Sequence, residues 1–141
     1  MTTSLEISKA LKEAGWKNEV EFYWYGDDLY FRNEMKDFCE TCEARTPGMY
    51  ITERKRFTAA PTAEEILEKL PPSIIVNGET LHLVIMDDRD WVGEASWDIC
   101  YSKDRLFSWD IHVREKGKIG DGAFAGACAK MWILLKKLNL L

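Results

Sequence analysis

The sequence predicts a single α+β domain over residues 1–141, with a mostly antiparallel sheet of about five or six strands. Three observations support this fold class: a capped helix within residues 62–70, alternating apolar and polar residues after residue 74, and an amphipathic segment at 123–138. We expect the N-terminal, central and C-terminal helices to pack chiefly on one face of the sheet. A chain of 141 residues can bury a core without help from disulfides or metal.

The N-terminal segment predicts a helix followed by a hairpin. Thr3 and Glu6 match a capping box, and apolar residues recur at helical spacing as far as Gly15. Residues 20–25 favour a strand, and a Gly-Asp-Asp turn separates them from a second strand at 29–31. Because side chains alternate along a strand, we expect aromatic residues on both faces, with Phe22 and Trp24 on one and Tyr23 and Tyr25 on the other.

Residues 32–56 have the least regular pattern. We expect a helical turn or two within 33–42 and a type II turn at Pro47-Gly48. Residues 49–53 favour an exposed strand, with an ordered loop as the alternative.

The central helix has clear boundaries. Thr62 and Glu65 complete a capping box, and Pro71-Pro72 stops the helix. Its buried face should carry Ile66, Leu67 and Leu70.

The second half of the chain predicts a meander covered by a helix. Asn77-Gly78 indicates a hairpin, and alternating segments at 97–102 and 107–113 indicate two further strands. After a glycine-containing link at 117–122, the last helix gathers one apolar stripe, namely Phe124, Cys128, Met131, Trp132, Leu135 and Leu138.

Composition excludes several classes of function. The hydrophobic fraction is 46%, the charged fraction is 30% and the net charge is −5, which argues against general nucleic-acid binding. Charged residues interrupt the N-terminal segment, so it lacks the apolar core of a secretory signal, and no run suffices for a membrane span. We therefore expect a cytoplasmic protein with no membrane association, and its cysteines fit a reducing compartment.

Four segments together resemble small uncharacterised proteins encoded by phages and prophages of bacteria: SLEISKALKEAGW, FYWY, APTAEEILEKLP and ACAKMWILLKKLNLL. The resemblance implies a mobile-element origin and a cytoplasmic setting in a bacterial host. It brings no catalytic residues with it, because the shared segments form the fold.

Two polar clusters are candidate metal sites. Cys39 and Cys42 form a C-x-x-C pair, but the other candidate ligands are isolated residues and no second pair follows. Asp87, Asp88 and Asp90 could hold Mg²⁺ or Ca²⁺, yet their spacing lacks the glycine and distal glutamate of an EF-hand. We favour ordinary thiols and a solvated acidic turn, and predict no cofactor.

A nucleophilic site is also disfavoured. His112 shares one strand face with Asp110 and Ser108, but residues spaced by two lie about 6–7 Å apart, too far for a hydrogen-bonded triad.

The aromatic residues are the strongest functional signal. Tyr23, Tyr25, Tyr30 and Trp91 cannot all face one helix layer, so they form either a second core or a binding surface. The leading hypothesis is a non-enzymatic interaction module for a host or phage protein, and the same surface could serve self-association. The alternative is a metal-dependent or thiol-based enzyme or ligand binder that uses the C-x-x-C pair or the aspartate cluster.

Overall fold

The computed structural model describes residues 2–89, 94–103, 111–118 and 122–141, with backbone alone for residues 88, 89, 94, 95 and 118. Strands of the described chain form two antiparallel sheets, ordered β2-β1-β3 and β4-β5-β6-β7. The α+β class is confirmed, although the strands divide between two sheets instead of forming one. The elements are α1 (Leu5–Glu13), β1 (Phe22–Tyr25), β2 (Asp28–Phe31), α2 (Arg32–Arg45), α3 (Met49–Arg54), β3 (Thr58–Ala59), α4 (Ala63–Leu67), β4 (Ser73–Val76), β5 (Glu79–Arg89), β6 (Glu94–Ser102), β7 (Ile111–Lys118) and α5 (Ala123–Lys137).

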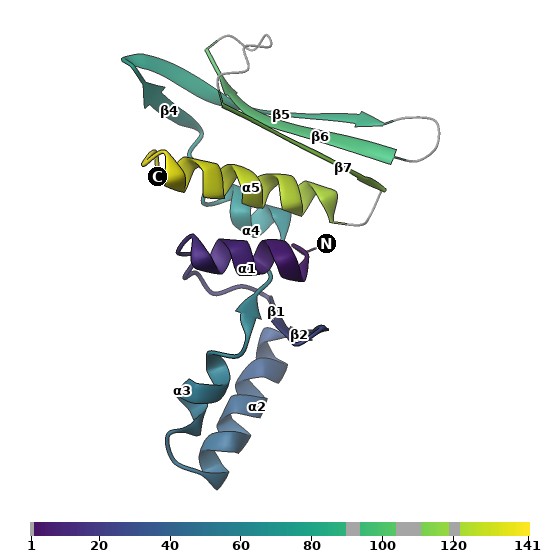
Figure 1. The fold of residues 1–141 in the computed structure, drawn as a ribbon, viewed down its shortest axis with the longest axis vertical. Coiled ribbons are helices and arrows are strands. Elements are labelled where there is room, and N and C mark those ends of the chain that lie inside the picture. The colour runs from purple at the N-terminus through teal and green to yellow at the C-terminus, as the bar shows by residue number, and fades with distance from the viewer. Residues whose placement is uncertain (1, 90–93, 104–110, 119–121) are drawn as a thin grey trace.

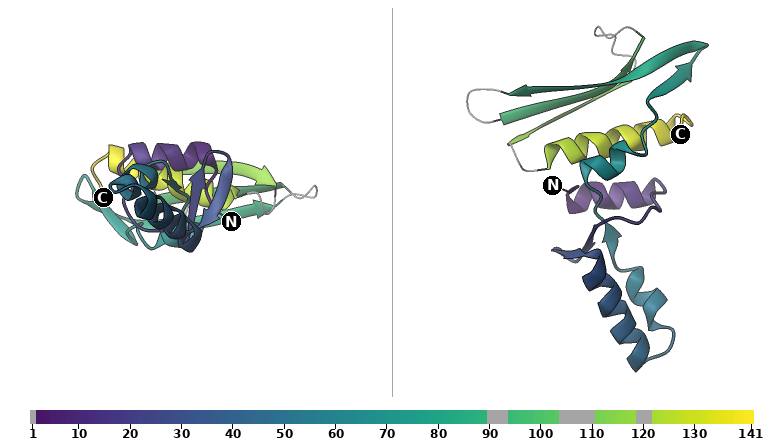
Figure 2. Two further views of the ribbon diagram at one scale, coloured as in Figure 1. Left: turned by 90° about the horizontal axis from the view of Figure 1, so that it is seen from below. Right: turned by 180° about the vertical axis from the view of Figure 1, so that it is seen from behind.

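The molecule is elongated and built in layers (Figure 1). The four-stranded sheet lies at one end, α5 runs beneath it, and α1 and α4 lie on the other side of α5. The small sheet follows, and α2 and α3 project beyond it as a helical hairpin (Figures 1 and 2). We refer to β1, β2, α2 and α3 as the projecting lobe.

Helix α5 is the centre of the core. Because it packs between a sheet and two helices, small residues are required on its faces as well as large ones. Gly126 shows the constraint, since a Cβ atom there would lie 3.1 Å from Cδ1 of Ile7 in α1. Of the predicted apolar stripe, the buried members are Cys128, Met131, Trp132 and Leu135, whereas Phe124 is partly buried and Leu138, just after the helix end, is 48% exposed. The additional buried positions are Ala125, Gly126, Ala127 and Ala129.

Hydrogen bonds tie the N-terminal segment to the middle of the chain. The amide of Thr3 donates to the carbonyl of Pro61 at 3.1 Å, and the indole of Trp24 donates to the carbonyl of Thr3 at 3.1 Å. Glu65 completes the predicted capping box with Thr62, and its other carboxylate oxygen accepts from the amide of Glu21 at 3.1 Å. One capping residue therefore also anchors the entry to β1.

Two helix predictions need correction. The N-cap of α1 is Ser4, which accepts from the Ile7 amide, because the hydroxyl of Thr3 is buried against Ser8 at 2.6 Å. The central helix α4 is shorter than residues 62–70, ending at Leu67 before a tighter turn to Leu70.

The projecting lobe differs most from the prediction. Helix α2 is much longer than one or two turns, and residues 49–54 form helix α3, so the expected strand at 49–53 is wrong. The carboxylate of Glu43 explains the helix, because it accepts from the amides of Gly48 at 3.1 Å and Tyr50 at 2.9 Å. These hydrogen bonds hold the pKa of Glu43 below its usual range.

Two of the predicted turns have the expected backbone geometry. Gly48 has φ 91° and ψ −6°, and the amide of Met49 donates to the carbonyl of Thr46, as a type II turn at Pro47-Gly48 requires. Asn77 and Gly78 both have positive φ and join β4 to β5 directly. Among the described residues, no helix combines the length and apolar character that crossing a membrane demands.

Candidate functional site

The two faces of the small sheet have different neighbours. Strand pairing places Tyr23 opposite Tyr30 and Ala59, and Trp24 opposite Leu29 and Thr58. The predicted alternation of aromatic residues along β1 is therefore confirmed. Helix α2 lies against the face that carries the tyrosines, and rings from this sheet face and from α2 meet there.

Four aromatic rings surround a surface pocket of about 270 Å³ in the projecting lobe, and we call it the aromatic pocket. Tyr25 lies at the centre of the ring cluster, with centroid distances of 4.7 Å to Phe57, 5.8 Å to Phe38 and 6.5 Å to Tyr30. Most of these contacts are edge-to-face, the geometry that aromatic quadrupoles favour. Phe57 is buried, whereas the ring of Phe38 is 43% exposed.

A carboxylate completes the aromatic pocket. Glu34, one helical turn before Phe38, lines the pocket, and its Oε1 accepts from the amide of Phe31 at 3.1 Å. A carboxylate has further lone pairs, so this hydrogen bond leaves acceptor capacity for a ligand. Arg56 reaches the hydroxyl of Tyr25 at 3.5 Å, and its charge is balanced by Glu53 at 3.6 Å.

The four aromatic residues predicted as a possible binding surface have different surroundings in the structure. Tyr25 and Tyr30 both line the aromatic pocket. Tyr23 is completely buried, its hydroxyl accepts from the amide of Val20, and the guanidinium of Arg54 lies 4.6 Å from its ring centroid. Trp91 lies outside the described residues.

Sequence reasoning did not single out Glu34, Phe38 and Phe57, which complete the aromatic pocket. Glu34 and Phe38 are four residues apart, a spacing that places side chains on one helix face. That signal was available once a long helix was assigned to residues 32–45.

The C-x-x-C cysteines both lie within α2. Cys39 is buried and Cys42 is partly buried, and burial raises the pKa of the Cys39 thiol, outweighing the nearby Arg54 charge. Cys100 and Cys128 are buried elsewhere, and burial raises the pKa of Cys128 to about 12. Raised thiol pKa values disfavour the thiolate that nucleophilic or metal-binding chemistry needs.

The predicted aspartate cluster is described only in part. Asp87 is exposed near the end of β5, only the backbone of Asp88 is described, and Asp90 lies outside the described residues. Within the part of the chain that the structure describes, no group of three or more His, Cys, Asp or Glu side chains could hold a metal ion.

His112 has a partner that its own strand did not suggest. Its Nε2 lies 2.6 Å from Oδ1 of Asp98 on the neighbouring strand β6, whereas Ser108 and Asp110 lie outside the described residues. Arg114 also donates to Asp98, from Nε at 2.8 Å. Cys100 is paired in register with His112, but it is buried and burial raises its pKa, so a cysteine nucleophile is not supported.

Comparisons of the chain with protein-family models, with curated proteins and with solved structures find no match. The fold and the site therefore define this protein: a layered α+β domain, centred on α5, whose projecting lobe carries an aromatic pocket with one carboxylate.

Proposed function

We propose that the protein is a non-enzymatic interaction module whose aromatic pocket receives a lysine or arginine side chain from a basic segment of a partner protein. The observation that carries the proposal is the combination of four rings with Glu34 in one open pocket. Aromatic faces attract cations through the ring quadrupole, and an adjacent carboxylate strengthens that attraction.

The size of the aromatic pocket suits one side chain of a macromolecular ligand. Its volume of about 270 Å³ lies below the usual range of about 300–1,000 Å³ for small-molecule sites. Other apolar residues of the projecting lobe are exposed as well, with Leu29 at 41% and Phe31 at 54%. By strand alternation these two residues lie on the sheet face opposite Tyr30, so they form a separate exposed apolar surface of the same lobe.

Charge favours a basic partner over an acidic one. The net charge of −5 creates a field that draws positively charged segments toward the molecule. The resemblance to phage and prophage proteins suggests that this partner is a host or phage protein, which includes nucleic-acid-binding proteins with exposed basic segments.

The test is a pull-down from bacterial host lysate followed by native mass spectrometry and cross-linking. Three baits are compared: the natural chain, Phe38→Ala in the aromatic pocket, and Ile75→Ala. Ile75 is 69% exposed on β4, in the other sheet, and is a matched apolar control. We expect a stoichiometric protein that the natural chain and Ile75→Ala capture and that Phe38→Ala loses while this variant stays folded at the assay temperature.

Two results would contradict the proposal. A partner that Phe38→Ala retains does not use the aromatic pocket. A partner whose cross-linked segment lacks lysine and arginine shows that the pocket does not select cations.

A further inference from the structure

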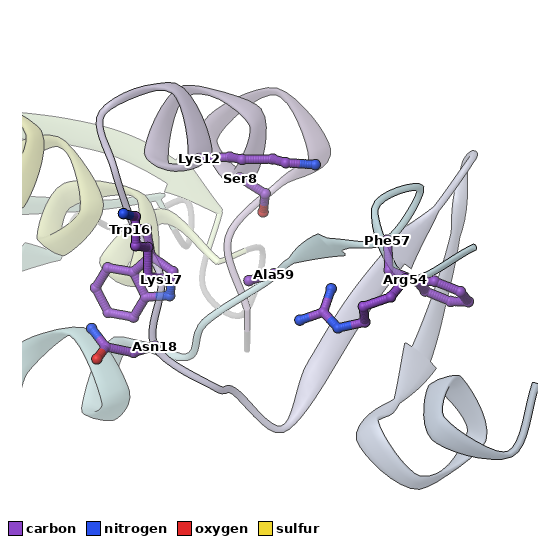
Figure 3. Close-up of a pocket in the computed structure, with 8 residues that line it drawn as sticks. All are labelled: Ser8, Lys12, Trp16, Lys17, Asn18, Arg54, Phe57 and Ala59. Carbon is purple, nitrogen blue, oxygen red and sulfur yellow. The ribbon is translucent and has the colours of Figure 1, made fainter. Parts of the chain in front are cut away.

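A second pocket lies between α1, the end of α3 and β3, and we call it the basic pocket (Figure 3). Its volume is about 80 Å³, room for a few water molecules or one small ion. It is lined by Ser8, Lys12, Trp16, Lys17, Asn18, Arg54, Phe57 and Ala59. Phe57 also lines the aromatic pocket, but the polar groups of the two pockets are different.

Charge in the basic pocket opposes that of the molecule as a whole. Lys12, Lys17 and Arg54 contribute three positive charges, and no carboxylate belongs to the lining that the structure describes. None of these three cations forms an ion pair with another described residue. A concentration of uncompensated positive charge in a concave site attracts anions.

Two of the three cations, Arg54 and Lys12, have contacts that hold them in place. The guanidinium of Arg54 lies 4.6 Å from the ring centroid of Tyr23, so a cation–π contact helps to hold it in place. The ammonium of Lys12 donates one hydrogen bond, to the carbonyl of Lys55 at 3.1 Å, and retains two further protons. Figure 3 shows the Arg54 guanidinium directed into the space beside Ala59, whereas the Ser8 hydroxyl is hydrogen-bonded to that of Thr3 at 2.6 Å.

The buried indole N–H of Trp16 is further evidence for a ligand in the basic pocket. Its side chain is 94% buried (6% exposed), and its indole nitrogen has no hydrogen-bond partner among the described residues. Figure 3 shows the nitrogen-bearing edge of this ring turned toward the same space as Arg54. A buried N–H without an acceptor is costly and rare in folded proteins, so an acceptor in the basic pocket would satisfy it.

We propose that the basic pocket binds a phosphate group, as inorganic phosphate or as the phosphate of a monoester. Phosphate offers several acceptor oxygens and close to two negative charges at neutral pH, which matches a lining that carries three cations and the indole N–H of Trp16. A carboxylate has one charge and two oxygens, and would leave some of these donors without an acceptor. The inference is independent of the proposed function, because it involves other polar residues and another ligand class.

The test follows the indole N–H resonance of Trp16 by nuclear magnetic resonance while sodium phosphate is added to the full chain. Trp16→Phe assigns the resonance by its disappearance. Parallel titrations with sodium chloride at matched ionic strength separate binding from screening. Phosphoserine and sodium acetate test the monoester and the carboxylate. We expect a saturable shift with phosphate and phosphoserine, a weaker effect with acetate, and none with chloride.

Variants locate the site. Arg54→Gln should weaken phosphate binding by about tenfold or more, because it removes charge-assisted hydrogen bonds. Arg45→Gln, on the exposed last turn of α2, makes the same chemical change away from the pocket and should bind as the natural chain does. Lys17→Gln, at an exposed position of the lining, provides a second test if loss of the Arg54 contact with Tyr23 impairs folding.

Each contrary result overturns the proposal. A linear shift, or an equal shift with chloride, shows no specific site. Phosphate binding that leaves the Trp16 resonance unmoved, or that survives both Arg54→Gln and Lys17→Gln, places the ion elsewhere. Equal affinity for acetate rejects phosphate as the selected class.

Discussion

The carboxylate of Asp98 and the imidazole of His112 meet across strands β6 and β7, with 2.6 Å between Oδ1 and Nε2. Strand alternation places this pair on the sheet face opposite Ile99 and Tyr101, which belong to the core between the sheet and α5. Arg114 donates to the same carboxylate, and Asp98 itself is only 5% exposed. One acidic residue thus joins two basic residues of β7 and fixes the pairing of the two strands.

Asp98→Asn should lower the free energy of unfolding by about 1–3 kcal/mol, because an amide removes the charge that both basic partners require. Urea denaturation followed by circular dichroism measures the change. Asp28→Asn, at an exposed position of β2, is the matched control and should stay within about 0.5 kcal/mol of the natural chain. Equal effects at the two positions would show that the Asp98 cluster does not stabilise the sheet.

The same cluster predicts a dependence of stability on pH. Burial alone would raise the pKa of Asp98, but hydrogen bonds and charge from Arg114 and His112 outweigh it and lower the pKa below its usual value. Because the folded pKa lies below the unfolded value of about 3.9, this contribution is complete above about pH 4 and is lost as pH falls through the folded pKa. Urea midpoints measured across this range should fall more steeply for the natural chain than for Asp98→Asn. Parallel curves would contradict the assignment.

Glu43→Gln should loosen the start of α3. The carboxylate of Glu43 accepts from the amides of Gly48 and Tyr50, and a neutral side chain accepts more weakly. We expect faster hydrogen exchange at these two amides, measured by nuclear magnetic resonance, with the four-stranded sheet unaffected. Glu40→Gln, on an exposed position of the same helix, should leave exchange unchanged. Protection that persists in Glu43→Gln would mean that α3 forms without this cap.

The helix at 49–54 could not be predicted from the local sequence. Met49 to Arg54 contains β-prone residues, and its helical state depends on a carboxylate that comes from the preceding helix. Local patterns did identify the turns at Gly48 and Gly78, because positive φ has a strong residue preference. The strand prediction failed because the deciding contact was tertiary.

The candidate sites show the same limit. Alternation along β1 predicted that Tyr23 and Tyr25 share a sheet face, and they do. It did not predict that Tyr23 would be buried while Tyr25 lines a pocket with Phe38 and Phe57. That difference depends on where α2 lies against the small sheet, which no local pattern specifies. The basic pocket likewise combines residues from α1, the following loop and α3.

Gly126 tests the close packing of α5 against α1. Gly126→Leu should destabilise the fold by about 1–3 kcal/mol or more, because its Cβ would already lie 3.1 Å from Cδ1 of Ile7 and the remaining atoms have no space. Gly126→Ala should have a much smaller effect, since the higher helix propensity of alanine, about 1 kcal/mol, offsets a contact with the flexible end of Ile7. Thermal and urea denaturation compare the two variants. A tolerated leucine would show that α1 and α5 are less tightly packed than the structure indicates.

Tyr101 links the four-stranded sheet to the segment that follows α4. Its hydroxyl donates to the carbonyl of Pro71 at 2.6 Å, and its side chain is completely buried. Tyr101→Phe should therefore lower the free energy of unfolding by about 1–2 kcal/mol at neutral pH, because the Pro71 carbonyl loses its donor. Tyr30→Phe, on the half-buried edge of the small sheet, removes a hydroxyl from the other end of the molecule and should have a smaller effect.

The stability difference between the natural chain and Tyr101→Phe should shrink in alkaline solution. Burial raises the pKa of Tyr101 to about 12, above the unfolded value of about 10. A pKa raised on folding gives stability that is complete below the unfolded value and is lost as pH rises toward the folded value. Urea denaturation at neutral pH and above about pH 10 measures both differences. A difference that stays constant with pH would contradict this, since it would mean that the Tyr101 phenol ionises equally readily in the folded and unfolded chain.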